Sequence, residues 1–398
     1  MSKTRPSIRA SALILAILTV ASTVPASAAP RAAAKKPPQP LAPSAILMDA
    51  RTNEVLYARG SDVRRPIAST TKIMTAIIVI EKAKLGSKVR VAAAAANVGE
   101  SSAELVKGER RTVKELLYAL MLQSANDAAA ALAIYVGKSL RGFVKMMNSK
   151  AIDVGAKRTH FANPHGLTAP RNYSTARDLA LMASFGLKDP CFARTVRTKS
   201  VKIPWPKHPS PRVFKNHNKL LWDLEGAVGV KTGYTSPAGH CLVGAAKNGP
   251  TTLIAVALGC ATSADAYAVT SALLRRGFAR YETDEVITKG RVYESLSLTD
   301  LAGQRVNLIA DHTVAPKLYD GDDGVELVPT VSRDATLPIT RGQVLGKVEA
   351  KRHDVVLASA PLVADRDADL PTFWSQLSAV WSQRLRVLST LAEHGTAP

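Results

Sequence analysis

The chain has 398 residues, of which 46% are hydrophobic and 21% charged, a length that accommodates roughly two or three domains with their own cores. Its 53 Lys and Arg residues against 32 Asp and Glu give a formal net charge of +21. These cations are spread along the chain, which argues against nucleic acid as a partner and favours an anionic wall polymer or an acidic membrane surface. The spacing of the three cysteines, Cys191, Cys241 and Cys260, matches no metal site. Their odd number leaves at least one thiol unpaired within the monomer, and we assign no disulfide.

The first 28 residues have the pattern of a secretory signal peptide. Basic residues precede an apolar run over residues 12–24, and small residues at 26–28 form a cleavage site. The run is shorter than the ~20 residues that span a bilayer, so cleavage is favoured over retention as a membrane anchor. Residues 29–43, rich in Pro, Ala and Lys, predict a linker. We therefore expect an exported protein.

A larger domain is expected over residues 44–283. Strand patterns lie at both ends of this block, over residues 45–48, 54–58, 226–234, 241–246 and 252–258. Helical patterns fill its interior and close it, over residues 66–84, 113–135 with a break near Ser124, 175–185 and 264–275. This order predicts an α+β fold, in which an antiparallel sheet is covered by helices and carries an all-helical lobe.

Two further segments follow this block. Residues 284–368 contain short strand-like runs separated by turn signals and predict a small β domain. Residues 369–393 form an amphipathic helical pattern with Trp374 and Trp381 on the apolar face. Such a helix is typical of a membrane interface, and the alternative is a helix packed on the β domain.

Ser69 and Lys72 form the first chemical motif, Ser-Thr-Thr-Lys, at the start of a predicted helix. Residues three apart on a helix share a face, so the lysine amine is within reach of the serine hydroxyl. A lysine that is partly desolvated and flanked by cations loses basicity and accepts a proton. We therefore expect Ser69 to be a nucleophile and Lys72 its general base.

The second motif, Ser124-Ala125-Asn126, interrupts a run of strong helix formers. Ser and Asn compete for backbone hydrogen bonds and favour the turn between two helices. We expect Ser124 to relay a proton to the leaving group and Asn126 to bind the substrate. An N-cap for a helix starting at Asp127 is the alternative, and it is compatible with catalysis.

The third motif, Lys231-Thr232-Gly233, lies on a predicted strand. Lys231 and Thr232 offer a charge and a hydroxyl to a substrate carboxylate. Gly233 permits close approach of the strand to the segment that bears Ser69. The backbone N–H of Tyr234 is expected to complete an oxyanion hole with that of Ser69. Together the motifs indicate a serine acyl-transfer enzyme whose substrate has a free carboxylate.

The chain resembles the low-molecular-mass penicillin-binding proteins, which are serine D-Ala-D-Ala carboxypeptidases of the DacA type, peptidase family S11. The resemblance covers residues 44–281 closely and the later β domain and terminal helix more loosely. It is carried by the sequence blocks at residues 67–76, 122–129, 163–167, 173–178, 231–235 and 238–242.

This resemblance implies a β-lactamase/transpeptidase-like fold and attack by Ser69 on the penultimate D-alanine of peptidoglycan stem pentapeptides. The terminal D-alanine leaves, and water then releases the tetrapeptide. β-Lactam antibiotics are expected to acylate the same serine. No cofactor and no metal are implied, and the expected location is the outer face of the cytoplasmic membrane or the cell wall.

Two positions depart from the family pattern. His217 and Ala266 stand where many relatives carry arginines associated with the substrate carboxylate. If His217 takes over this role, carboxylate binding is expected to weaken as the imidazole deprotonates near neutral pH.

Three alternative functions are distinguishable. A class A-like β-lactamase needs a glutamate to activate the deacylating water, and the segment between Glu115 and Glu225 contains none. An endopeptidase that cuts cross-links between stems has the same motifs and stays open. A non-catalytic wall-binding protein is disfavoured by the complete set of motifs.

Overall fold

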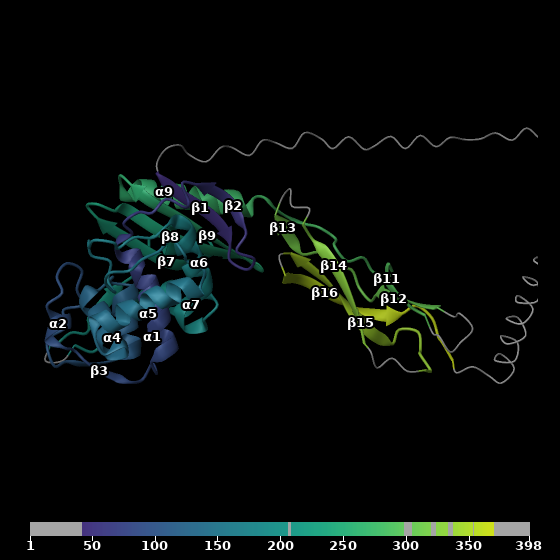
Figure 1. The fold of residues 1–398 in the computed structure, drawn as a ribbon, viewed down its shortest axis with the longest axis horizontal. Coiled ribbons are helices and arrows are strands. Elements are labelled where there is room, and N and C mark those ends of the chain that lie inside the picture. Colours follow the sequence, from purple (N-terminus) through teal and green to yellow (C-terminus); the bar gives the residue numbers. More distant parts are fainter. Residues whose placement is uncertain are drawn as a thin grey trace, which may run out of the picture. The chain divides into compact units, whose positions relative to one another are not determined.

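The computed structural model describes residues 42–205, 208–297, 305–319, 324–332, 337–352 and 354–369. Within these residues the chain forms an α+β domain followed by the strands of a second sheet (Figure 1). The predicted signal peptide and nearly all of the predicted linker and amphipathic helix lie outside the described residues.

In the described part of the chain, the first domain is built on a five-stranded sheet in which every neighbouring pair is antiparallel. In spatial order its strands are β2 Val55–Arg59, β1 Ser44–Asp49, β9 Thr251–Cys260, β8 Gly239–Asn248 and β7 Ala227–Thr235. Successive side chains of a strand face opposite sides of a sheet. Accordingly Ile46 and Met48 enter one core and Leu47 the other.

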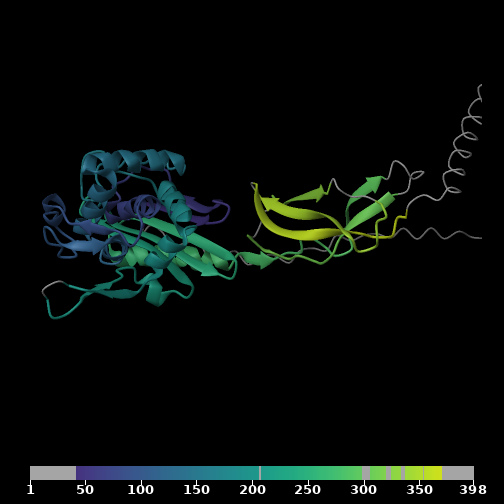
Figure 2. The same cartoon turned by 90° about the horizontal axis from the view of Figure 1, so that it is seen from below.

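Helices cover both faces of this sheet. Helix α9, Ser263–Phe278, packs through Val269, Leu273 and Leu274 against one face. Helices α1, Lys72–Lys82, and α6, Ala176–Leu187, contribute to the core on the other face. Figure 1 shows α9 and the helical lobe on opposite sides of the sheet, and Figure 2 shows the same ribbon from below. The layering therefore follows from apolar residues on both faces of the central strands.

The helical lobe is assembled around α4, Asn126–Gly137, whose first eight residues are all buried. A helix that is apolar on every side is stable only when other helices enclose it, and the Ala-rich sequence fits this position. The preceding helix α3, Val113–Met121, starts with a capping box between Thr112 and Glu115. The break predicted near Ser124 is confirmed.

The remaining elements of this domain are short or were not predicted. They are η1 Ala68–Thr71, β3 Lys88–Arg90, α2 Ala93–Ala96, β4 Arg110–Thr112, α5 Leu140–Asp153, α7 Pro190–Arg197, β5 Ser200–Ile203, β6 Arg212–Lys215 and α8 Leu220–Asp223.

The later part of the chain, predicted as a small β domain, contains a second five-stranded sheet within the described residues. Its strands, in spatial order within the described residues, are β11 Val292–Ser297, β12 Arg305–Ala310, β16 Val355–Ala364, β15 Val344–Arg352 and β14 Glu326–Val331. Two shorter strands, β10 Tyr281–Thr283 and β13 Lys317–Tyr319, pair with each other. Val306, Leu308, Val348 and Leu362 lie in the core of the second sheet.

The three cysteines are free thiols, and Cys241 and Cys260 are buried. Burial raises the pKa of Cys241 to about 11. Across the described residues, no helix is both long and apolar enough to cross a bilayer.

Candidate active site

The predicted nucleophile, Ser69, lies on the 3₁₀ turn η1 directly before helix α1. The preceding residue, Ala68, has a φ of 46°, a left-handed conformation that L-residues rarely adopt. Gly166 packs against this strained point so closely that a Cβ atom there would meet the Ala68 carbonyl at 2.0 Å. Tertiary packing thus fixes the backbone that presents Ser69.

The side-chain amine of Lys72 is surrounded by three oxygen atoms. Nζ lies 2.8 Å from Ser69 Oγ, 2.7 Å from Asn126 Oδ1 and 2.6 Å from the backbone carbonyl of His165. The lysine is completely buried. A neutral amine has two N–H donors and one lone pair. In the protonated form the amine donates to all three oxygens. In the neutral form it can donate to Asn126 and His165 and keep its lone pair for the Ser69 hydroxyl, which is the arrangement a general base requires.

The electrostatics of the site favour this neutral form. Burial, assisted by the charge of Lys231, holds the pKa of Lys72 well below its ordinary value. The carboxylates of Glu100 and Asp127 oppose this shift to a smaller extent. Desolvation disfavours a charged amine, and a neighbouring cation adds to the penalty. The loss of basicity expected from the sequence is confirmed.

The second motif lies at the start of α4, where Asn126 contacts Lys72 and Ser124 lines the cleft. The amide of Asn126 accepts from Lys72 and donates to the Gly99 carbonyl at 2.9 Å. The N-cap of α4 is Ala125, without a side-chain cap, so the N-cap alternative for this motif is wrong. Ser124 lines the cleft with a φ of 61°. Among the described residues, no partner to its hydroxyl is found.

The carbonyl of His165 was not singled out for a role in the sequence analysis. Asn163 shapes its turn by donating to the Leu167 carbonyl at 2.9 Å and accepting from the Gly166 N–H at 2.7 Å. Thr75, on α1, donates to the Pro164 carbonyl at 2.6 Å. A backbone acceptor leaves no signature in residue type, and only the Asn-Pro-His-Gly turn marked this segment.

Lys231 is also completely buried, but its surroundings differ. Its Nζ donates to the backbone carbonyl of the next residue, Thr232, at 3.0 Å. Burial lowers its pKa to about 7. The sequence predicted a permanent positive charge on Lys231, but an amine with this pKa is only partly protonated near neutral pH. An anion bound beside it would restore the charge, because an opposite charge favours the protonated form.

Gly233 brings strand β7 against the nucleophile, as predicted. A Cβ atom at this position would lie 2.9 Å from Ser69 N and 3.1 Å from Thr70 N. β7 is the edge strand of the sheet, and Tyr234, which is 59% exposed, stacks on His240 at 4.4 Å between ring centroids. This edge of the sheet thus borders Ser69 directly.

These side chains border a cleft of about 350 Å³. Of the predicted residues, Ser69, Ser124, His217, Thr232, Gly233 and Tyr234 line it. The structure adds residues to which the sequence analysis assigned no role, namely Glu100, Ser101, Lys219, His240, Cys241, Leu242, Ser263 and Tyr267. Ala266 also borders the cleft, so the departure noted at this position falls within the site.

His217 is held at the cleft wall through its backbone. The hydroxyl of Tyr267 donates to the His217 carbonyl at 2.9 Å and accepts from the Lys219 N–H at 3.0 Å. Burial, and then the charge of Lys231, lowers the pKa of His217 below its ordinary value. The imidazole therefore loses its proton at a more acidic pH than the sequence led us to expect.

The α+β fold and the contact between Ser69 and Lys72 match what the sequence predicted for a serine acyl-transfer enzyme of the transpeptidase-like class. Residues 31–262 match the family model for D-alanyl-D-alanine carboxypeptidases, and residues 281–369 match the C-terminal domain of penicillin-binding protein 5. The carboxypeptidase DacF of Bacillus subtilis is 33% identical over 354 residues, which cover 86% of this chain and 90% of DacF.

Solved structures agree. DacD from Francisella tularensis has a TM-score of 0.62 at 26% identity, and the match covers 86% of this chain and 98% of DacD. Penicillin-binding protein 5 from Haemophilus influenzae has a TM-score of 0.62 at 29% identity, and the match covers 84% of this chain and 100% of that protein. The chain belongs to the D-alanyl-D-alanine carboxypeptidase family, which confirms the predicted family, fold and serine carboxypeptidase function.

Proposed function

We propose that Ser69 is the acyl-ester nucleophile with which this protein removes the terminal D-alanine from peptidoglycan stem pentapeptides. The observation that carries the assignment is the contact of 2.8 Å between Ser69 Oγ and Lys72 Nζ. Two acceptors occupy the hydrogens of the neutral amine, so its lone pair faces the hydroxyl. A serine beside such a base is activated for attack on a carbonyl.

The reaction then uses the rest of the cleft in sequence. Lys72 accepts the Ser69 proton while the hydroxyl attacks the penultimate D-Ala carbonyl. Backbone N–H groups of Ser69 and Tyr234 stabilise the oxyanion, and Ser124 passes the proton to the leaving amine. Water enters after the D-alanine departs, and its attack on the ester releases the tetrapeptide and restores Ser69.

The other end of the substrate is bound by the third motif. The carboxylate of the terminal D-alanine is held by Lys231 and Thr232, with His217 beside them, and Asn126 contacts the peptide. A carboxylate restores the charge of Lys231 because a nearby opposite charge favours the protonated amine. β-Lactams present a carboxylate and an acyl group in similar positions, and they acylate Ser69.

We also propose the domain layout and location that the sequence indicates. Residues 1–28 direct export, residues 29–43 form a linker, and residues 44–283 are the carboxypeptidase domain. Residues 284–368 form the small β domain, and residues 369–393 associate with the membrane surface. The enzyme works at the outer face of the cytoplasmic membrane. Binding of the full chain, but not of a chain ending at residue 368, to anionic vesicles tests the last segment.

The decisive experiment is incubation of the full chain with a labelled penicillin, followed by mapping of the adduct by mass spectrometry. We expect the label on Ser69 and release of D-alanine from diacetyl-L-Lys-D-Ala-D-Ala by the same preparation. Ser69→Ala is expected to fold and to lose both. A label on another residue, or D-alanine release by Ser69→Ala, would contradict the assignment.

Two assays separate the alternatives. Rapid turnover of nitrocefin would indicate a β-lactamase, whereas a slowly hydrolysed acyl-enzyme supports the carboxypeptidase. Digestion of purified muropeptides separates the endopeptidase, since free D-alanine without loss of cross-linked dimers indicates carboxypeptidation.

A further inference from the structure

Glu100 stands out in the cleft because its side chain has no structural task. Of the cleft-lining residues within the described part of the chain, it is the one carboxylate. It is exposed, and no hydrogen bond or ion pair to another described residue involves its carboxylate. An acidic side chain left unpaired at a reaction site is available to a ligand.

The cleft around Glu100 is otherwise cationic. Two buried lysines, Lys72 and Lys231, adjoin the lining of the cleft. The lining itself contains a third lysine and two histidines, namely Lys219, His217 and His240. The charge of Glu100 raises the pKa of Lys72, which places the carboxylate within electrostatic reach of the reacting serine. Glu100 therefore adds a negative position to a cleft whose other charges are positive.

The backbone at Glu100 is held on both sides. Its φ is 64°, in the left-handed region that costs a non-glycine residue free energy. On one side the amide of Asn126 donates to the Gly99 carbonyl at 2.9 Å. On the other side the backbone N–H of Asn126 donates to the Ser101 carbonyl at 2.7 Å. The segment is thus tied to the residue that also positions Lys72.

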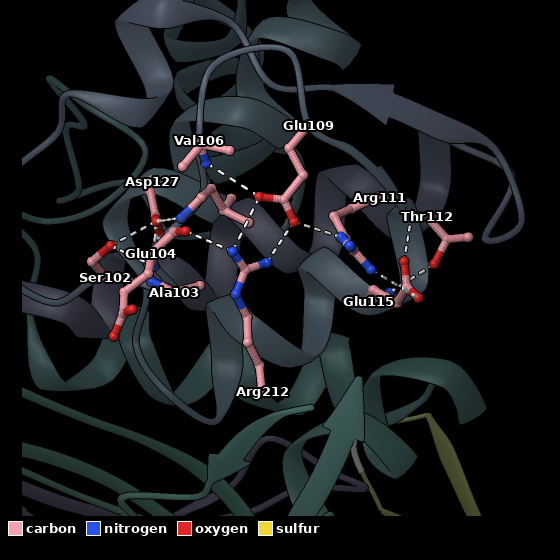
Figure 3. A network of polar contacts seen from close by, with 11 residues as sticks. Ser102, Ala103, Glu104, Val106, Glu109, Arg111, Thr112, Glu115, Asp127 and Arg212 are labelled. Atoms are coloured by element: carbon pink, nitrogen blue, oxygen red, sulfur yellow. Dashed lines mark hydrogen bonds and ion pairs between the residues drawn. The ribbon is translucent and has the colours of Figure 1, made fainter. Parts of the chain in front are cut away.

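The residues that follow Glu100 are anchored by two buried carboxylates (Figure 3). Asp127 accepts from the Ser102 hydroxyl at 2.7 Å. Farther along, Arg212 donates to the Glu104 carbonyl at 2.6 Å and pairs with the second carboxylate, that of Glu109. Figure 3 shows the Arg212 guanidinium between the Glu104 carbonyl and the Glu109 carboxylate. The loop therefore presents Glu100 from a fixed base, as a specificity contact requires.

The proposed function assigns the terminal carboxylate of the substrate to Lys231 and Thr232 on strand β7. Glu100 lies between two residues whose carbonyls accept from Asn126 at the start of α4, so it borders the cleft from the helical lobe and not from β7. In a peptide that ends in D-Ala-D-Ala, the last two side chains are methyl groups. The nearest side chain that can carry a charge is that of the residue preceding them.

We propose that Glu100 is a specificity-determining residue that binds a primary ammonium group on the stem residue preceding D-Ala-D-Ala. The inference rests on the proposed function and adds to it the charge of the acyl donor. Glu100 thereby favours stems whose third residue has a free amine over stems whose third residue has a neutral side chain. Because the site is open to water, the preference is modest, about fivefold in kcat/KM, and decreases as salt is added.

The test compares two peptides on the full chain. Nα-acetyl-L-Lys-D-Ala-D-Ala carries the free amine, and diacetyl-L-Lys-D-Ala-D-Ala has it neutralised. The wild-type protein is expected to prefer the first by about fivefold, mainly through KM, at low ionic strength. Glu100→Gln is expected to abolish this preference by lowering kcat/KM for the free-amine peptide selectively.

Glu104→Gln is the matched control. Glu104 lies in the same loop, is exposed and also has a positive φ, 56°, but does not line the cleft. It is expected to keep the preference. Equal rates of wild-type protein with both peptides would overturn the inference. So would a Glu100→Gln variant that slows both peptides equally, or one that slows release of the penicilloyl group, which would make Glu100 a base for water instead.

Failure of the inference is distinguishable from failure of the proposed function. Penicillin labelling of Ser69 and D-alanine release from the diacetyl peptide do not involve the amine. If both occur without any preference, the function stands and the role of Glu100 is wrong. If neither occurs, the proposed function itself fails.

Discussion

The two buried lysines of the cleft make an instructive comparison. Lys72 and Lys231 are both completely buried, and burial lowers the pKa of each. The amine of Lys72 is surrounded by Ser69, Asn126 and the His165 carbonyl. The amine of Lys231 donates to the neighbouring carbonyl of Thr232 at 3.0 Å. One lysine has its hydrogen-bonding capacity used by the protein, and the other retains capacity for a ligand.

This difference teaches that burial alone does not assign a role to a lysine. Desolvation lowers the pKa of both lysines, but the number and type of their hydrogen-bond partners decide the role of each amine. A lone pair directed at a hydroxyl makes a base, whereas an amine with unused donors makes an anion-binding group. The following predictions test this division from the largest expected effect to the smallest.

Replacement of Lys72 should be the most damaging change. Lys72→Ala is expected to slow acylation by penicillin about 10²–10⁴-fold, because it removes the general base. Lys72→Arg should not restore the rate, since a guanidinium keeps its proton. Stopped-flow or gel-based measurement of acylation rates tests this. Retention of most of the rate by the arginine variant would show that Lys72 supplies charge and not a lone pair.

Gly233→Ala should push strand β7 away from the turn that bears Ser69. The added Cβ would lie 2.9 Å from Ser69 N, so β7 must move away from the nucleophile. Loss of one oxyanion contact predicts a decrease of about 10²–10³-fold in kcat for D-alanine release. Gly86→Ala, where a Cβ meets nothing within 4 Å, is the control and should be neutral. A fully active Gly233→Ala variant would disprove the close approach.

Lys231→Met should weaken substrate binding and leave folding intact. Loss of a charged hydrogen bond predicts an increase in KM of about tenfold to a hundredfold. In the wild-type protein the pKa of Lys231 is about 7, so kcat/KM should decrease as the pH rises above this value and the free enzyme loses the charge. A Lys231→Met variant whose KM equals that of the wild type would remove Lys231 from the carboxylate site.

The same lysine makes a prediction about stability. Its folded-state pKa of about 7 lies below its ordinary value of 10.5, so between these pH values the unfolded chain binds more protons. The contribution of Lys231 therefore makes the free energy of unfolding increase with pH over this window. Urea denaturation of the wild type and Lys231→Met at pH 7 and pH 9 tests this, since only the wild type should gain through this group.

His217→Ala should have the smallest effect. Burial and Lys231 lower the pKa of His217, so the imidazole is mainly neutral at pH 7 and contributes little charge to carboxylate binding. We expect KM at pH 7 to rise less than about fivefold, within the range of a neutral hydrogen bond. The ratio of variant to wild-type KM should increase toward acidic pH. A pH-independent KM that is identical in both proteins would exclude His217 from binding.

Much of the site was predictable because short motifs combine the nucleophile with its neighbours. The spacing of Ser69 and Lys72 predicted their contact, and the glycine at 233 predicted a close approach of strand and turn. Both are local or depend on the absence of a side chain, which a sequence shows directly. The fold class followed from strand patterns at both ends of a helical block.

The contributions of Glu100, Tyr267 and the His165 carbonyl were not predictable in the same way. Glu100 comes from a loop without regular periodicity, and its place in the cleft depends on anchors to Asp127 and Arg212, far away in the sequence. The segment between Glu115 and Glu225 contains no glutamate, but Glu100, which precedes α3 in the sequence, lines the cleft.

By itself the sequence determined the chemistry, since residue types and spacing specify a nucleophile, a base and an anion-binding strand. Tertiary structure alone decided the electrostatic state of these groups. The pKa of a lysine depends on burial and on partners contributed by distant segments, such as Asn126 and His165 for Lys72. Those distances are set by packing of the sheet, the helical lobe and the connecting loops, and no single segment encodes them.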